Sequence, residues 1–210
     1  AYFAQVWRNS QARAATNTQA AQATSQVTRS GRPLADVVAD VLVSPATDDR
    51  IGRIVRLYEA FTGRHPDTAT LAGLIAERDK GFSPAALATE LGRTPEFASR
   101  YTAGNNSGFV GAVYRNLLGR APSAAEVATA AKLLASGTTR AAFVASASDS
   151  QEYRLRTVQL TRTVDIWFSL LQQAPDGASY NSWPARLGSG TAPSALVAAL
   201  LPRAVWVKRP

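Results

Sequence analysis

The chain has 210 residues and no cysteine, so it can bury a sizeable core but offers neither a disulfide framework nor thiolate-based metal or redox chemistry. Its formal net charge of +8 comes from 20 arginines and 3 lysines against 15 acidic residues, a bias that suits either an anionic polymer or solvated helix flanks. No long uncharged apolar run occurs, so no membrane span is predicted.

The first 50 residues carry isolated elements of a pattern that becomes clear further along the chain. They are the pair Val6–Trp7, then Arg13, Gly31 and Pro33. Each stands 50 or 51 positions ahead of a matching element in the next segment. The Gly-x-x-Pro turn of that segment is missing here, so we expect a degenerate copy of the unit that follows.

Residues 51–106 show the unit in full. Apolar side chains at spacings of three and four predict an amphipathic helix; they are Ile51, Ile54, Val55, Tyr58 and Phe61. Gly63 ends this helix, and a second helix is predicted from Pro66 to Gly81.

Two more elements complete the unit. Ser83–Pro84 is typical of a helix start, and Leu87 and Leu91 give the third helix its apolar face. A short turn follows from Thr94 to Tyr101, and residues 102–108 form the clearest predicted loop.

The same order of elements returns 56 positions later. The recurring elements are Val113–Tyr114, Gly119–Arg120, Pro122, Gly137 and Glu152–Tyr153 with Arg156. A weaker copy, with Ile166–Trp167, Pro175 and Gly190, stands 53 positions further on. We therefore predict an all-α protein of tandem helical repeats, with three to four helices each, packed as a compact array.

The predicted repeat boundaries are 1–50, 51–106, 107–159 and 160–210, with the outer two repeats degenerate. The repeats form either one continuous helical domain or two paired halves. Because the chain has no methionine and begins at Ala1, we expect a processed protein or a piece of a larger one.

The motif of the two middle repeats resembles the DUF4214 family. The residues that carry the resemblance are Thr94–Phe97, Phe109–Val110, Val113–Pro122 and Leu134–Gly137, with Tyr180, Trp183, Leu187 and Gly190 more loosely similar. The resemblance implies a module of large secreted bacterial proteins, including surface-layer and repeat-in-toxin types, that serves attachment or assembly. A related pattern occurs in the basic, helical linker domains of phycobilisomes, but the four-fold repetition is more similar to DUF4214.

The repeated turn is interpreted as structural. Its members are Gly63, Arg64 and Pro66 in one copy and Gly119, Arg120 and Pro122 in the next. The glycine suits a left-handed helix cap, and the arginine can bind the last carbonyls or a nearby carboxylate. The alternative is that the arginine contacts a ligand.

The candidate ligand-binding residues are cationic or aromatic. One predicted arginine group is Arg50, Arg53 and Arg56, and a second is Arg154, Arg156 and Arg162. Tyr180 and Trp183 lie near a polar segment and could stack on a ligand.

Enzymatic chemistry has no motif to support it. The single histidine, His65, occupies a turn position that Ala121 fills in the next repeat. We predict no catalytic residue, no metal site and no cofactor.

We therefore expect a non-catalytic, secreted or cell-surface bacterial module for attachment or assembly. Its expected partners are an anionic cell-surface polysaccharide or an acidic protein, and self-assembly is a further option. The alternative is a basic nucleic-acid-binding or phycobilisome-linker-like scaffold protein.

Overall fold

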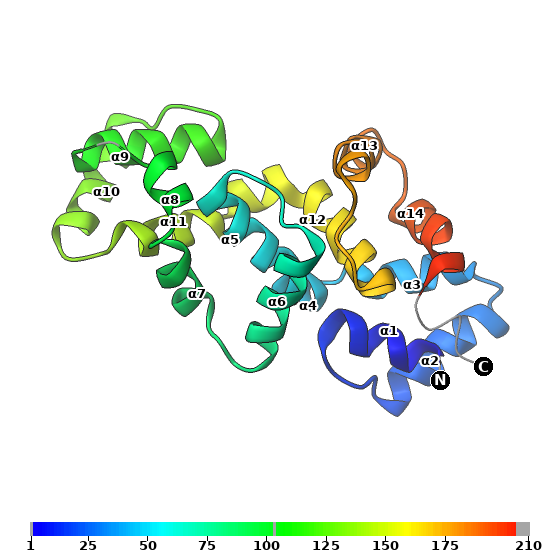
Figure 1. The fold of residues 1–210 in the computed structure, drawn as a ribbon. Helices are drawn as coiled ribbons and strands as arrows, with labels where there is room; N and C mark the ends of the chain where they lie inside the picture. Colours follow the sequence, from blue (N-terminus) through cyan, green and yellow to red (C-terminus); the bar gives the residue numbers. More distant parts are fainter. Residues whose placement is uncertain (1, 103, 205–210) are drawn as a thin grey trace. The chain divides into compact units, whose positions relative to one another are not determined.

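A computed structural model describes residues 2–102 and 104–204 (Figure 1). Every regular element in these ranges is helical and none is a strand, which confirms the all-α prediction. Within the same ranges, no helix combines the length and the apolar character needed to cross a membrane. Ala103 of the predicted loop and residues 205–210 of the predicted fourth repeat lie outside the described residues.

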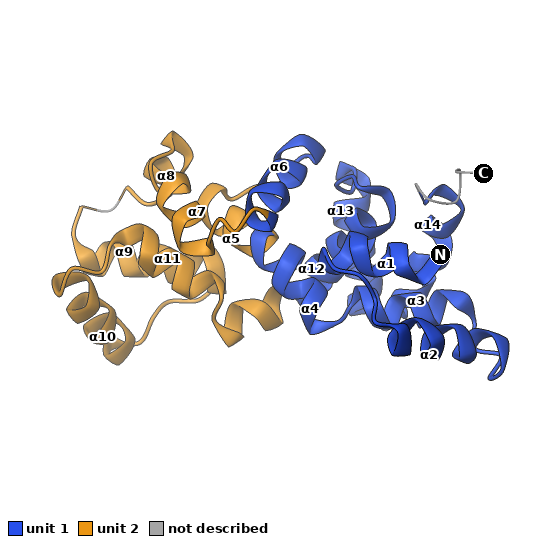
Figure 2. Ribbon diagram, turned by 90° about the horizontal axis from the view of Figure 1, so that it is seen from below, with its two compact units in different colours: residues 1–54, 66–79, 158–210 blue, residues 55–65, 80–157 orange. Residues whose placement is uncertain are grey.

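The chain divides into two compact units, which Figure 2 shows in separate colours. Unit 1 comprises residues 1–54, 66–79 and 158–210, and unit 2 comprises residues 55–65 and 80–157. Each unit therefore joins segments that are far apart in the sequence. Helix α5 (Arg53–Thr62) and helix α12 (Gln151–Leu171) each contribute residues to both units.

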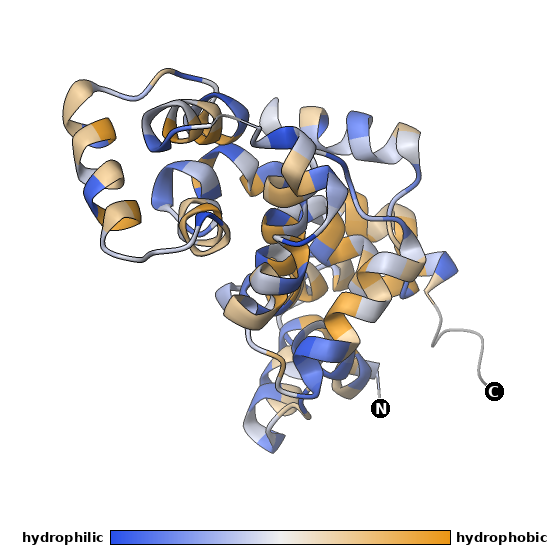
Figure 3. Ribbon diagram, turned by 60° about the vertical axis from the view of Figure 1, so that its left-hand side comes forward, coloured by the Kyte–Doolittle hydropathy of each residue, from blue (hydrophilic) through white to orange (hydrophobic). Residues whose placement is uncertain are grey.

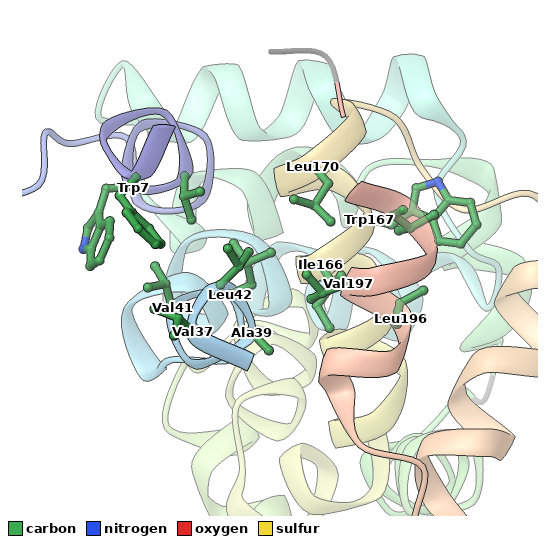
Figure 4. Close-up of a cluster of buried hydrophobic side chains, with 14 of the residues drawn as sticks. Trp7, Val37, Ala39, Val41, Leu42, Ile166, Trp167, Leu170, Leu196 and Val197 are labelled. Carbon is green, nitrogen blue, oxygen red and sulfur yellow. The ribbon is translucent and has the colours of Figure 1, made fainter. Parts of the chain in front are cut away.

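Unit 1 contains helices from the two ends of the chain together with one helix, α6, from its middle. They are α1 (Tyr2–Gln11), α2 (Asn17–Thr28), α3 (Leu34–Leu42), α4 (Pro45–Thr47), η1 (Asp48–Gly52), α6 (Thr68–Asp79), α13 (Gly177–Gly188), α14 (Pro193–Leu200) and η3 (Leu201–Arg203). The apolar faces of α1, α2, α3 and α14, with the unit 1 part of α12, enclose one core cluster, in which Leu42, Ile166 and Leu196 are fully buried (Figure 4).

Unit 2 contains the middle of the chain. Besides its parts of α5 and α12, it holds α7 (Pro84–Leu91), α8 (Pro95–Arg100), α9 (Asn106–Val113), η2 (Tyr114–Leu118), α10 (Ala124–Ala135) and α11 (Arg140–Ser148). A series of neighbouring rings runs through its core: Phe61, Phe97, Tyr101, Phe109 and Phe143, with centroids 5.0 to 5.9 Å apart. Hydrophobic and hydrophilic residues alternate along the helices, as expected when one face of each is buried (Figure 3).

The predicted loop at 102–108 is too long. Helix α9 begins at Asn106, because the side chain of Asn105 accepts a hydrogen bond from the backbone N–H of Gly108 at 2.8 Å. Asparagine at this position satisfies a free amide of the first helical turn and so favours an earlier start. The composition of the segment suggested a loop, whereas its asparagine acts as a cap.

The ends of successive helices share a backbone conformation. The first long helix of each predicted repeat is followed by a residue with positive φ, namely Ala12 (54°), Gly63 (74°), Gly119 (68°) or Gln172 (55°). Alanine and glutamine thus adopt, in the two outer segments, the conformation that glycine adopts in the middle ones. The conformation recurs where the repeat pattern places it, while the four-repeat organisation stays a prediction. The predicted boundaries after residues 50 and 159 fall inside η1 and α12.

Candidate functional site

A groove in unit 1 is formed by α1, α2 and α3 together with the start of α4. It has a cavity volume of about 520 Å³, and the lining residues that matter below are Trp7, Gln11, Gln22, Gln26, Val37 and Val41. We call it the amide groove. Figure 4 shows Trp7, Val37 and Val41 at the edge of the core cluster.

Helical spacing places the glutamines on one wall of the groove and the two valines on another. Gln19, Gln22 and Gln26 are three and four residues apart on α2, so they share a face. Val37 and Val41 share a face of α3 in the same way. The start of α2 is fixed by a capping box, in which Thr16 accepts from the N–H of Gln19 and the Gln19 side chain accepts from the N–H of Thr16.

The groove carries one cation and one anion. Arg13 donates to the carbonyl oxygen of Ala14 at 3.1 Å and to Gln19 Oε1 at 3.0 Å. Asp40 lies 3.0 Å from a nitrogen of Arg32. Both charges are therefore partnered at the rim, and the walls between them are made of amides and apolar groups.

The first predicted arginine group does not form a continuous surface. Arg50 pairs with both carboxylate oxygens of Asp79, at 2.9 and 2.6 Å, and also donates to the carbonyl oxygen of Asn9 at 2.7 Å. Arg53 is half-exposed, 3.4 Å from Asp49. Arg56, in unit 2, is only 2% exposed and lies 3.8 Å from Asp149. Arg56 is therefore not placed to contact a polymer, because its side chain is buried.

The second group is likewise divided. Arg154 and Arg156 are exposed on the unit 2 part of α12, and Arg162 is half-buried in the unit 1 part. Arg154 lies 4.0 Å from Asp149, and Arg156 donates to the carbonyl oxygen of Leu118 at 3.3 Å. Only Arg154 and Arg156 of this group present exposed guanidinium groups on one unit.

The two predicted aromatic residues have different surroundings. Tyr180 is buried, and its hydroxyl donates to the carbonyl oxygen of Pro66 at 2.9 Å, so it serves packing and not ligand stacking. Sequence reasoning gave Tyr180 the wrong exposure because a long-range contact, invisible to local pattern, covers it. Trp183 is half-buried, and the guanidinium of Arg186 lies 3.9 Å from its ring centroid.

The turn of the first middle segment lies in unit 2 up to His65. Gly63 has φ of 74°, and a Cβ there would lie 2.3 Å from a nitrogen of Arg100. Arg64 lies over the ring of Tyr58 and 3.3 Å from Glu96. Pro66 is buried in unit 1.

The turn of the second middle segment has the same contacts. A Cβ on Gly119 would lie 2.8 to 3.0 Å from the guanidinium of Arg156. Arg120 lies over the ring of Tyr114 and binds the carboxylates of Glu126 and Glu152 at 2.7 to 3.0 Å. Pro122, in the same turn, is half-buried two residues before α10. The absence of a side chain at each glycine leaves space for an arginine side chain from a later helix. We call this arrangement, Gly63 with Arg100 and Gly119 with Arg156, the glycine socket.

The exposed ion pairs shift the pKa values of their members. Hydrogen bonds from Arg120 and from the N–H of Ser123 lower the pKa of Glu126 to about 2. The hydrogen bond from Arg120 also lowers the pKa of Glu152 and, in return, the pKa of Arg120 is raised. The turn arginine is therefore bound to carboxylates of its own unit, which occupies the donors that a ligand contact would need.

Sequence reasoning missed the amide groove. Its sequence signal is the run of glutamines at helical spacing in residues 16–28, and such a polar pattern does not by itself indicate a binding site. In the described ranges, no three histidine, aspartate or glutamate side chains come together in a group that could hold a metal ion.

These features describe an all-helical protein in which a glycine–arginine turn occurs twice in unit 2, while unit 1 holds a polar groove. Residues 88–157 match the model of the DUF4214 family, a domain of unknown function. This segment, about a third of the chain's length, is similar to the DUF4214 family. No curated protein and no solved structure matches the chain. The likeness to phycobilisome linkers stays a prediction.

Proposed function

We propose that the protein is a non-catalytic attachment module that binds a saccharide in the amide groove of unit 1, at the surface of a bacterial cell or outside it. The observation that carries the proposal is the composition of the groove, where glutamine amides stand over an apolar floor of Trp7, Val37 and Val41. Amides both donate and accept hydrogen bonds, and an apolar floor suits the C–H face of a pyranose ring.

Unit 2 supplies a rigid body in this proposal. Its two glycine sockets tie the end of one helix to the side chain of a later one, so they hold helices in register without offering free groups for chemistry. The secreted or surface location follows from the resemblance of the DUF4214 segment and stands as part of the proposal.

The proposal is tested with an immobilised panel of neutral and acidic oligosaccharides. We expect the wild-type chain to bind at least one of them and the double variant Gln22→Ala/Gln26→Ala to lose that binding. Thr18→Ala is the matched control, because Thr18 is exposed on the same helix but does not line the groove. Absence of binding to every saccharide, or equal binding by the groove variant, would refute the proposal.

A second candidate function is binding of an acidic polymer or protein by unit 2. It is favoured by Leu155, which is 66% exposed between the exposed Arg154 and Arg156 on α12. Side-by-side salt titrations of binding to DNA and to an acidic polysaccharide test it, with Arg154→Ala as the variant. Tight DNA binding with a steep salt dependence that Arg154→Ala weakens supports this second function over the first.

A further inference from the structure

The orientation of one side chain in the amide groove restricts the chemistry of the ligand. The Oε1 atom of Gln11 is buried, and it accepts no hydrogen bond from any residue in the described ranges. A buried carbonyl oxygen without a donor is costly, and most such groups in folded proteins have a partner. Because Gln11 lines the groove, a ligand bound there can supply the missing donor.

A chain of hydrogen bonds fixes which end of the Gln11 amide faces which way. Thr47 Oγ1 donates its only proton to the carbonyl oxygen of Val41 at 2.9 Å. In the 3.2 Å contact between Ser44 Oγ and Thr47 Oγ1, Ser44 is therefore the donor. Ser44 Oγ can then accept from Gln11 Nε2, also at 3.2 Å. The NH₂ end of the amide is committed to the protein, and the carbonyl end is left as an acceptor.

The other polar groups of the groove agree with an uncharged partner. Arg13 and Asp40 oppose each other in sign, and each is bonded to a neighbour in the protein. Gln26 accepts from Arg32 at 2.8 Å. Gln22 is exposed and has no hydrogen bond to any residue that the structure describes, so its amide is free to bind.

An anionic group is a poor occupant of the site at Gln11. A carboxylate, sulfate or phosphate oxygen offers no proton, and it would bring negative charge beside a carbonyl oxygen. A hydroxyl group offers a proton and adds no charge. The terminal torsion of glutamine is broad, so the Gln11 amide can adjust to a hydroxyl group that approaches from the groove.

We infer that the amide groove selects a neutral, hydroxyl-rich saccharide, one hydroxyl of which donates to Gln11 Oε1 while Gln22 binds a second polar group of the sugar. This inference rests on the proposed function and departs from the anionic polysaccharide expected from the net charge. The ligand binds beside α1 and α2, and the arginines of the chain do not provide its affinity.

The experiment compares binding of neutral hexasaccharides of glucose, mannose and galactose with binding of oligogalacturonate, by calorimetry at low and high salt. We expect one neutral hexasaccharide to bind with an affinity that salt does not change, and oligogalacturonate to bind more weakly. Binding of no saccharide overturns the proposed function as well. Binding of oligogalacturonate alone, weakened by salt, overturns this inference and leaves the proposed function standing.

Variants of Gln11 test the acceptor directly. Gln11→Leu removes it, so the affinity for the neutral saccharide should fall about tenfold. The melting temperature should change little, because removal of the unsatisfied Oε1 offsets loss of the hydrogen bond to Ser44. Gln11→Glu keeps an acceptor and should bind more tightly than Gln11→Leu. Gln5→Leu, the same substitution on α1 outside the groove, should leave the affinity unchanged.

A merely structural role for Gln11 would lower the melting temperature of Gln11→Leu and spare its affinity, which contradicts the inference. If the leucine variant does not fold, Gln11→Met, which is unbranched and closer in shape, takes its place. Wild-type affinity in either folded variant overturns the assignment of Gln11.

Discussion

Substitution of Gly119 by alanine should destabilise unit 2 by more than its backbone conformation alone requires. Gly119 has φ of 68°, and a Cβ there would lie 2.8 Å from one nitrogen of Arg156. Gly31 is the matched control, because its φ is 65° and a Cβ would meet nothing within 4 Å. The two positions share the left-handed conformation and differ in the arginine.

The expected magnitudes follow from these two terms. A left-handed conformation costs alanine about 1 kcal/mol relative to glycine, which is the full expected loss for Gly31→Ala. In Gly119→Ala the guanidinium must also move, and loss of its hydrogen bond to the carbonyl oxygen of Leu118 adds about 0.5 kcal/mol at this exposed position. The excess should vanish when Gly119→Ala is made in an Arg156→Ala background.

Urea unfolding followed by far-ultraviolet circular dichroism measures these free energies, and near-constant m-values are required for the comparison. Equal losses for Gly31→Ala and Gly119→Ala would show that the glycine socket contributes nothing. An excess that persists without Arg156 would assign the cost to another contact. Either result refutes the reasoning.

Three further predictions concern charged groups. Arg120 lowers the pKa of Glu126 to about 2, so the stabilisation from Glu126 is present above its unfolded-state pKa and is lost as the pH falls towards 2. A carboxyl NMR titration checks this, and an ordinary pKa for Glu126 refutes it. The hydrogen bond with Glu59 raises the pKa of His65, so its stabilisation is complete below 6.5 and lost as the pH rises through the folded-state pKa. His65→Ala should therefore flatten the pH dependence of the melting temperature in this range, and an unchanged slope contradicts the assignment. Arg56→Ala should cost about 2 kcal/mol by removing a buried charge partner, yet leave DNA binding unchanged; a stable variant with weaker DNA binding would restore Arg56 as a contact.

The helices and turn glycines were accessible from the sequence because they depend on neighbours along the chain. Alternation of apolar residues at three and four marks a helix wherever the helix packs, and a glycine after it marks a left-handed cap. Gly63 and Gly119 have that conformation. Ala12 and Gln172 adopt it without glycine, which no local rule indicates.

The exposure and the partners of the charged and aromatic candidate residues depend on contacts with residues that are distant in sequence. Arg50 and Arg56 look alike on a helical wheel, yet one binds Asp79 and the other is buried near Asp149. Tyr180 is covered through a carbonyl group 114 positions away. A linear pattern gives residue types and spacing, but it does not say which helix will pack over them.

The amide groove could not be predicted from the sequence for a different reason. Its residues come from the successive helices α1 to α4, and neither the glutamines nor the valines form a motif by themselves. Gln11 looks like an ordinary polar residue at a helix end. Its significance arises only from the direction of the hydrogen bonds through Ser44 and Thr47.

The glycine socket bears on where a self-sufficient folding segment begins and ends. The family match runs from residue 88 to residue 157, so it includes Gly119 with Arg156 but includes Arg100 without Gly63. A protein shortened to those residues would also lack Ala60, whose carbonyl oxygen accepts from both Arg100 and Tyr101. The segment that the family model matches is therefore shorter than the segment that satisfies its own hydrogen bonds. That larger segment extends back at least to residue 60.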